Sequence, residues 1–348
     1  MTKKIVKYIT VSLLLILLSS LIGGCSKNNK SSDPITNSEI LMGTVVTVTL
    51  YDSIDKSILT KVFDKVKDLE SILSINENGT LVDKINENAG ISPVKVDDDT
   101  FTIIKKGIEY SNLTNGLFDI SIGPLVKLWS IGLPEAKVPT LEEINEKLPL
   151  INYNDIEINE DEKTVFLKRK GMMIDLGGIA KGYTADIISN ILTEEGVKSA
   201  IINLGGNVYT HGTKVNGTNW NIGIQNPFSD RGDIVGTISI SNKSIVTSGI
   251  YERYIDQDGV KYHHILNPKT GYPYDNEIAG ITIISDNSVD GDALSTSVFA
   301  MGLDNGLEFI NTLNGIDAIF VTKNNKVYIT DGIKDIFKLS NSDFTLEN

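Results

Sequence analysis

Residues 200–255 read AIINLGGNVYTHGTKVNGTNWNIGIQNPFSDRGDIVGTISISNKSIVTSGIYERYI, and this stretch decides the fold class. Short apolar and β-branched runs alternate in it with Gly, Asn, Asp and Pro, the residues that favour turns. The pattern predicts five strands without an intervening helix: 200–209, 220–225, 236–241, 244–247 and 251–255. Strands joined by turns pair antiparallel, whereas parallel strands need a long crossover. We therefore predict an α+β fold with mostly antiparallel sheets rather than a doubly wound parallel sheet.

Hydrophobic spacing outside this stretch predicts the remaining elements. The run ILMGTVVTVTL at 40–50 alternates β-branched residues and predicts one strand near the start of the fold. Helical spacing predicts helices at 58–73, 99–112, 141–147, 180–195, 292–301 and 306–313. Further strands are predicted at 155–158, 164–168, 172–176 and 280–285. No repeat of solenoid period is visible, which argues against a repeat architecture.

The first 38 residues predict a lipid anchor and a tether. Three lysines precede an apolar run at 8–22 that is short for a membrane span, and the run leads to Gly-Gly-Cys25, the only cysteine. We predict a lipoprotein signal peptide at 1–24 and lipidation of Cys25, with an ordinary signal peptide as the alternative. Polar residues 25–38 are predicted to be a flexible tether. The single domain, 39–348, would then lie at the extracytoplasmic face of the cell membrane.

Charge limits the ligands that this domain can bind. The formal net charge is -13, and loss of the three lysines of the leader makes it -13 - 3 = -16. A surface so acidic argues against a general nucleic-acid binder. A polyanionic ligand would need a local metal ion or a group of backbone N–H donors.

The segment MMIDLGGIAKGYTADIISNILTEEG, 172–196, predicts a strand ending at Asp175, two glycines and a helix from Ala180. Free N–H groups at that helix start, with Lys181 in its first turn, would suit a phosphate. The alternative is that the glycines only let the helix pack against the strand. The spacing is not that of a Walker loop, and GxGxxG is absent from the chain.

A second helix start carries oxygen ligands. In DNSVDGDALSTSVFAMG, Asp292, Ser295 and Thr296 stand at i, i+3 and i+4, on one helical face. Carboxylate and hydroxyl oxygens suit Mg²⁺ rather than zinc. The alternative is that Asp292 caps its helix and the hydroxyls have no ligand.

Three further segments leave alternatives open. In NGLFDISIGPLVKLW, a buried Phe118 beside an exposed Asp119 could wall a ring-binding pocket, with core packing as the default. In INLGGNVYTHG, Gly205-Gly206 is explained by a bulge, and His211 is predicted to be a turn residue. In YHHILNPKTGYP, 262–273, an extended chain would turn His263 and His264 to opposite faces, which disfavours a shared zinc ion. One of them should face the site, as a structural or a catalytic residue.

Taken together, these segments resemble the FAD:protein FMN transferase family, also called ApbE. The resemblance is carried, in order, by LMGTVVTVTL, GLFDISIGPLVKLW, IDLGGIAKGYTAD, INLGGNVYTHG, VTSGIYERYI, HHILNPKTGYP and DALSTSVFAMG. It implies two similar T-fold-like halves with a flavin between them. It also implies transfer of FMN from FAD to a threonine hydroxyl of a partner protein, which forms a phosphoester and releases AMP.

The resemblance implies a role for each matching residue. Contacts to FAD, the substrate, would come from Met42, Leu117, Phe118, Asp119, Asp175, Lys181 and Leu266. A Mg²⁺ ion would be held by Asp292, Thr296 and the carbonyl of Gly178, with Ser295 as a possible fourth ligand. His264 would be the catalytic base, and His263 would be dispensable.

Two positions depart from the family pattern. Asn76 stands where many members carry an aromatic residue against the flavin, and Asn267 stands where an acid is common. The expected acceptor is a membrane or surface redox protein of the Nqr or Rnf type, or an extracellular electron-transfer flavoprotein, with a threonine motif that this chain lacks. The rival functions are an extracytoplasmic FAD pyrophosphatase that releases FMN and AMP, and a flavin-binding lipoprotein without catalysis.

Overall fold

A computed structural model describes residues 33–53 and 55–347. The predicted signal peptide, Cys25 and most of the tether lie outside the described residues. Strand β1 (Ile35–Leu41) starts within the segment assigned to the tether, so ordered structure begins before residue 39. Within the described ranges, no helix combines the length and the apolar character needed to cross a membrane.

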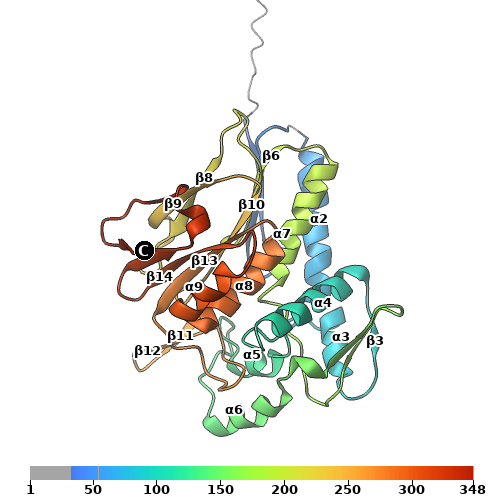
Figure 1. The fold of residues 1–348 in the computed structure, drawn as a ribbon. Helices are drawn as coiled ribbons and strands as arrows, with labels where there is room; N and C mark the ends of the chain where they lie inside the picture. The colour runs from blue at the N-terminus through green and yellow to red at the C-terminus, as the bar shows by residue number, and fades with distance from the viewer. Residues whose placement is uncertain (1–32, 54, 348) are drawn as a thin grey trace, which may run out of the picture. The chain divides into compact units, whose positions relative to one another are not determined.

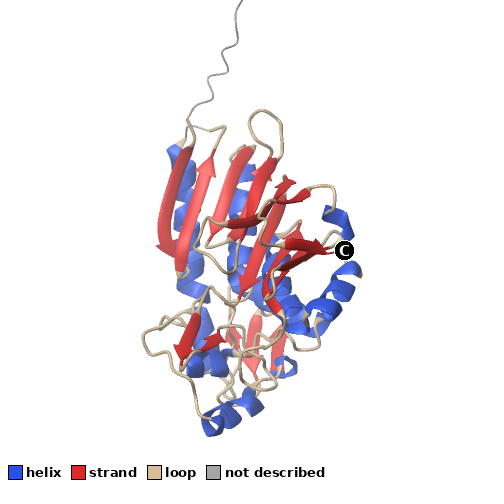
Figure 2. Ribbon diagram, turned by 90° about the vertical axis from the view of Figure 1, so that its left-hand side faces the viewer, coloured by secondary structure: helices blue, strands red, loops and turns tan. Residues whose placement is uncertain are grey.

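One mixed sheet of nine strands organises the fold (Figures 1 and 2). Its order is β1-β2-β6-β7-β10-β13-β14-β15-β17, and every neighbouring pair is antiparallel except β15 and β17. The further strands are β2 (Thr44–Leu50), β6 (Ser199–Leu204), β7 (Asn207–Gly212), β10 (Lys243–Gly249), β13 (Ile278–Ser285), β14 (Asp317–Thr322), β15 (Lys326–Ile329) and β17 (Thr345–Glu347). The predicted α+β class with mostly antiparallel pairing is therefore confirmed.

The sheet divides into two halves with the same order of elements. The first half runs β1, β2, α2 (Lys56–Leu73), α7 (Ala180–Glu194), β6, β7. The second runs β10, β13, α8 (Ser288–Met301), α9 (Leu303–Asn311), β14, β15. Pairing of β7 with β10 joins the halves into one sheet, which agrees with the two similar halves predicted.

Helices cover one face of this sheet, as Figure 2 shows. On the other face of the second half lies a small sheet of β8 (Trp220–Gln225), β9 (Ile234–Ile240) and β16 (Phe337–Leu339). Successive side chains of β13 point to opposite faces of the large sheet. Ile281 and Ile283 belong to the core on the helix side, while Ile284 packs with β8 and β9 on the other side. This explains why all eight residues of β13 are buried.

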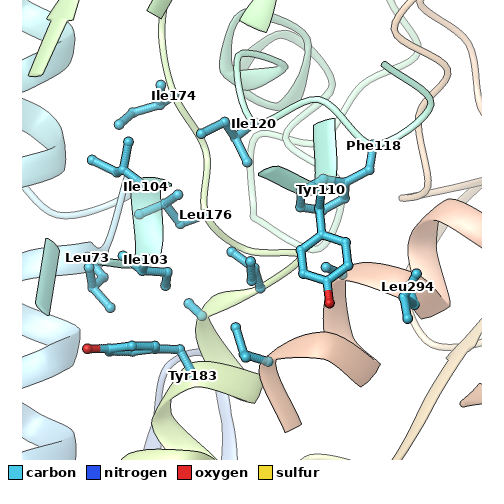
Figure 3. Packing of buried hydrophobic residues seen from close by; sticks show 14 of the residues in the cluster. Leu73, Ile103, Ile104, Tyr110, Phe118, Ile120, Ile174, Leu176, Tyr183 and Leu294 are labelled. Carbon is cyan, nitrogen blue, oxygen red and sulfur yellow. The ribbon is translucent and has the colours of Figure 1, made fainter. Parts of the chain in front are cut away.

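Insertions carry the rest of the chain. Between α2 and α7 lie α3 (Leu81–Glu87), β3 (Val94–Lys95), α4 (Asp98–Leu113), α5 (Gly123–Trp129), α6 (Leu141–Lys147), β4 (Ile156–Asn159) and β5 (Thr164–Leu167), with 3₁₀ turns at Leu148–Leu150 and Tyr153–Asp155. The hairpin β11 (Tyr254–Gln257) and β12 (Val260–His263) separates β10 from β13, and a third 3₁₀ turn spans Asp331–Ile333. Figure 3 shows where the first insertion meets the core: Tyr110 of α4 lies beside Phe118 and turns its hydroxyl toward α8.

Three predicted elements are corrected. The strand predicted at 40–50 is a hairpin, because Met42 and Gly43 both take positive φ (54° and 68°), as a two-residue turn between antiparallel strands requires. Gly205-Gly206 likewise forms the turn between β6 and β7 and not a bulge within one strand. Residues 172–176 are not a strand, since only Met173 forms an isolated bridge, to Ile122.

Candidate active site

The start of α7 receives a carboxylate from a distant part of the chain. The N–H groups of Ile179 and Ala180 donate to the Leu176 carbonyl, at 3.0 and 2.8 Å. The N–H of Gly182 donates to Asp292 Oδ2 at 2.8 Å. The predicted set of free N–H donors is therefore reduced, because the N–H groups of Ile179, Ala180 and Gly182 already have acceptors within the protein. What the turn presents instead is the carboxylate of Asp292 and the side chain of Lys181.

Asp292, Thr296 and Gly178 come together at this point. Asp292 is only 4% exposed, and its Oδ1 lies 3.7 Å from Lys181 Nζ. A Cβ on Gly178 would lie 3.7 Å from Thr296 Oγ1, so the segment before α7 contacts the helix that carries Asp292. Within the described chain, the Thr296 hydroxyl has no hydrogen-bond partner, whereas the neighbouring Ser297 hydroxyl donates to the Ala293 carbonyl. Thr296 is thus the hydroxyl free to bind a ligand.

These oxygens fit a hard divalent cation. Within the described residues, no three His, Cys, Asp or Glu side chains gather as a metal site, so a site here must use hydroxyl and carbonyl oxygens. Carboxylate, hydroxyl and carbonyl oxygens are the donors that Mg²⁺ accepts. Ser295 is less suited than predicted, because its buried hydroxyl donates to the Asp292 carbonyl at 2.9 Å and shares a hydrogen bond with Ser248 at 2.8 Å.

His264 directly follows β12 and is half-buried. Its Nδ1 lies 3.3 Å from the backbone carbonyl of Arg253, and because a carbonyl can only accept, Nδ1 carries the proton and Nε2 presents a lone pair. Desolvation by the surrounding protein, followed by the charge of Arg253, lowers the pKa of His264 to about 3. The imidazole is therefore neutral at pH 7, with the Nε2 lone pair available.

His263 turns the other way, as alternation predicted. It is buried edge-on against Phe299, its Nε2 donates to the Tyr274 carbonyl at 2.7 Å, and its Nδ1 accepts from the N–H of Ile265 at 3.3 Å. His263 therefore faces the core, and these contacts give it a structural role. His211, predicted to be a turn residue, is instead buried in β7 between Ser189 and the carbonyl of Val197, at 3.0 Å from each.

Phe118 and Asp119 lie beside the oxygen cluster. Phe118 is buried, and its ring edge lies 3.0 Å from the Cβ position of Gly178. Asp119 was expected to be exposed, but it is 7% exposed and accepts hydrogen bonds from the Ser121 N–H and hydroxyl and from the Tyr153 N–H. Burial raises the pKa of Asp119. Its carboxylate therefore orders this loop through Ser121 and Tyr153.

Three other residues predicted to contact FAD have partners of their own in the structure. Met42, in the β1–β2 turn, accepts a hydrogen bond on Sδ from Thr184 of α7 at 3.4 Å. The carbonyl of Leu117 accepts from the hydroxyl of Tyr274 at 3.5 Å. Leu266 is buried in a cluster with Leu125, Trp129 and Ile144.

Asp175 and Asn76 lie near basic side chains that were not predicted to belong to the site. Asp175 accepts from the N–H of Gly177 at 2.8 Å, and desolvation raises its pKa against the opposing charges of Arg253, Lys127 and Lys181. Exposed Asn76 accepts from Lys127 Nζ at 3.1 Å. Lys127 and Arg253 therefore join Lys181 around Asp175. Both belong to motifs quoted above, but their proximity to Asp175 arises only from tertiary packing.

The fold and the site together define a class of protein: an α+β enzyme whose site pairs an oxygen cluster suited to a cation with basic side chains and a neutral histidine. The family model described as "ApbE family" matches residues 42–320, and this chain belongs to that family.

Named relatives and solved structures agree. A Klebsiella pneumoniae protein named FAD:protein FMN transferase is 41% identical over 293 residues, covering 84% of this chain and 90% of that protein. The crystal structure of the ApbE protein of Thermotoga maritima aligns with a TM-score of 0.80 at 32% identity, covering 87% of this chain and 98% of that one. The flavin transferase ApbE of Vibrio cholerae aligns with a TM-score of 0.79 at 27% identity, covering 87% and 99%.

Proposed function

We propose that this protein transfers FMN from FAD to a threonine hydroxyl of a partner protein, with Mg²⁺ bound by Asp292, Thr296 and the Gly178 carbonyl. The observation that carries the proposal is the meeting of Thr296, Gly178 and Asp292 where α7 begins, with Lys181 at 3.7 Å from the carboxylate. Bound there, the cation would neutralise charge on the phosphate oxygens. The names of the relatives supply the substrate class.

In the proposed reaction, the pyrophosphate bond of FAD breaks and a phosphoester bond to the threonine forms. The threonine oxygen attacks the phosphorus on the FMN side, a new O–P bond forms, and the bond to the bridging oxygen of AMP breaks. His264 Nε2 accepts the hydroxyl proton, since its Nδ1 is held by the Arg253 carbonyl. Lys181, whose ammonium also lies 3.2 Å from the Gly177 carbonyl, favours the negative charge that develops on the nonbridging oxygens and on AMP.

One incubation separates this function from its two rivals. The protein without residues 1–25 is mixed with FAD, Mg²⁺ and a candidate acceptor domain, then denatured and separated by electrophoresis. Flavin fluorescence that stays with the acceptor supports the transferase. Free FMN and AMP without labelled acceptor would support the pyrophosphatase, and unreacted FAD would support a binding protein.

We further propose that lipidation of Cys25 anchors the domain at the extracytoplasmic face of the cell membrane, next to a membrane or surface redox protein that accepts the flavin. The basis is the single cysteine after an apolar run and two glycines. Metabolic labelling with a radioactive fatty acid should mark the wild-type protein and leave the Cys25→Ala variant unlabelled. A labelled Cys25→Ala variant would reject the assignment.

A further inference from the structure

The first amide groups of α8 are capped by a side chain from another helix. Asp186 of α7 accepts from the N–H of Ser288 at 2.7 Å and, through its other oxygen, from the N–H of Val289 at 2.9 Å. Asn287, at the N-cap position of α8, makes no side-chain capping bond, and its amide donates to Asp290 instead. The carboxylate of Asp186 therefore caps the first N–H groups of α8 in place of the N-cap side chain.

The capping is reciprocal. Ile179, at the N-cap position of α7, also lacks a side-chain capping bond, and α7 receives the carboxylate of Asp292 from α8 on the N–H of Gly182. A Cβ on Gly182 would lie 2.3 Å from the Ser288 carbonyl oxygen, so glycine permits this close approach. Two carboxylates, one from each helix, thus set how α7 and α8 dock.

This docking sets the geometry of the proposed metal site, because the site draws on both helices. The Gly178 carbonyl belongs to the segment that leads into α7, while Asp292 and Thr296 belong to α8. A small displacement of α8 along α7 would change the distance from the Gly178 carbonyl to both other ligands. Metal affinity is sensitive to such displacements, since groups that hold the ligands contribute about 10- to 100-fold.

We propose that Asp186 is a positioning residue for the metal site, acting through α8 on Asp292 and Thr296. The inference rests on the proposed function, because it takes those residues as the ligands. Asp186 does not touch the substrate in this role.

A second set of contacts keeps α8 attached when Asp186 is changed. The Ser288 hydroxyl donates to Asn207 Oδ1 at 2.6 Å and accepts from the Ser244 hydroxyl at 2.8 Å, which ties the helix start to β7 and β10. Loss of Asp186 should therefore loosen the position of α8 without releasing the helix. This predicts weaker metal binding in a folded protein.

The test compares Asp186→Asn, Asp186→Glu and Tyr110→Phe in the full-length protein. Asn keeps one acceptor oxygen and places an amide against the second N–H, whereas Glu keeps both acceptors. Tyr110→Phe is the matched control, because it removes a 2.7 Å hydrogen bond from α4 to Asp290 on the same helix and leaves the amide groups capped. Free Mn²⁺ is measured by electron paramagnetic resonance with FAD present, and FAD binding without metal is measured by fluorescence.

Asp186→Asn should raise the Kd for Mn²⁺ about 10-fold or more, with partial recovery in Asp186→Glu. FAD binding without metal should change less than about 2-fold, and Tyr110→Phe should keep the wild-type Kd for Mn²⁺ while losing stability. Wild-type Mn²⁺ affinity in Asp186→Asn, or equal loss in Tyr110→Phe, would overturn the proposal, as would a wild-type protein that binds no Mn²⁺. A wild-type protein that binds Mn²⁺ but transfers no FMN would refute the proposed function alone, because the positioning role is judged on Mn²⁺ affinity.

Discussion

His264 Nδ1 lies 3.3 Å from the backbone carbonyl oxygen of Arg253, and this contact fixes which ring nitrogen is free. The adjacent His263 holds the opposite tautomer, because its Nε2 donates to the Tyr274 carbonyl and its Nδ1 accepts from Ile265. Hydrogen bonds to backbone groups therefore give the two neighbouring histidines different tautomers. Only His264 has a nitrogen lone pair without a partner in the described chain.

His264→Ala should lower the rate of FMN transfer by about 10²- to 10⁴-fold, because the threonine hydroxyl loses its proton acceptor. FAD affinity should stay within a few-fold of wild type. The rate is measured from covalent flavin on the acceptor, and affinity from flavin fluorescence. His263→Gln is the neighbouring control, expected to retain transfer. An unchanged rate in His264→Ala would remove the base assignment.

Thr296→Val removes the hydroxyl that has no partner and keeps the side-chain shape, so we expect the Mg²⁺ concentration for half-maximal transfer to rise about 10-fold or more. Ser297→Ala, one residue along α8, removes a hydroxyl that donates to the Ala293 carbonyl and should leave the Mg²⁺ requirement unchanged. Titration of Mg²⁺ at saturating FAD measures both. If Thr296→Val and Ser297→Ala need the same Mg²⁺ concentration for half-maximal transfer, Thr296 is not a ligand.

Gly182→Ala should destabilise the protein although alanine favours helices by about 1 kcal/mol over glycine. The new Cβ would lie 2.3 Å from the Ser288 carbonyl oxygen and 2.7 Å from Asp292 Cβ, so α7 and α8 must separate. Overpacking of this kind costs about 1–3 kcal/mol, and urea unfolding should show a net loss. Asn190→Ala, at an exposed position of α7, is the control and should not destabilise. Equal or greater stability of Gly182→Ala would show that the helices are not in close contact.

His263 should make stability depend on pH. Burial lowers the pKa of His263 below its ordinary value of 6.5, so the unfolded chain binds this proton more readily than the folded one. Its contribution is therefore present above pH 6.5 and is lost as the pH falls from 6.5 toward the folded pKa. His263→Gln keeps a donor for the Tyr274 carbonyl and cannot be charged. The difference in unfolding free energy between wild type and His263→Gln should shift in favour of the variant between pH 7 and pH 5, and a constant difference would contradict the assignment.

Sequence alone could select most residues of the candidate site, but not their hydrogen-bond partners. Asp292, Thr296 and Lys181 could be selected by residue type and helical spacing. The bond from Gly182 to Asp292 joins residues 110 apart, and that from Ser288 to Asp186 joins residues 102 apart. No local pattern encodes such pairs, which is why the N–H groups at the start of α7 were predicted to be free.

Sequence by itself determined the α+β class and the type of most of the predicted elements, because hydrophobic period, turn residues and β-branching act within a dozen residues. It also determined the family, through motifs in a specific order. Tertiary structure alone decided that α7 and α8 cap each other and which histidine keeps a free nitrogen. It likewise decided that Thr296, and not Ser295, has the open hydroxyl. These outcomes depend on which backbone N–H and C=O groups meet when distant segments pack, and the chain can satisfy those groups in many ways until the core closes.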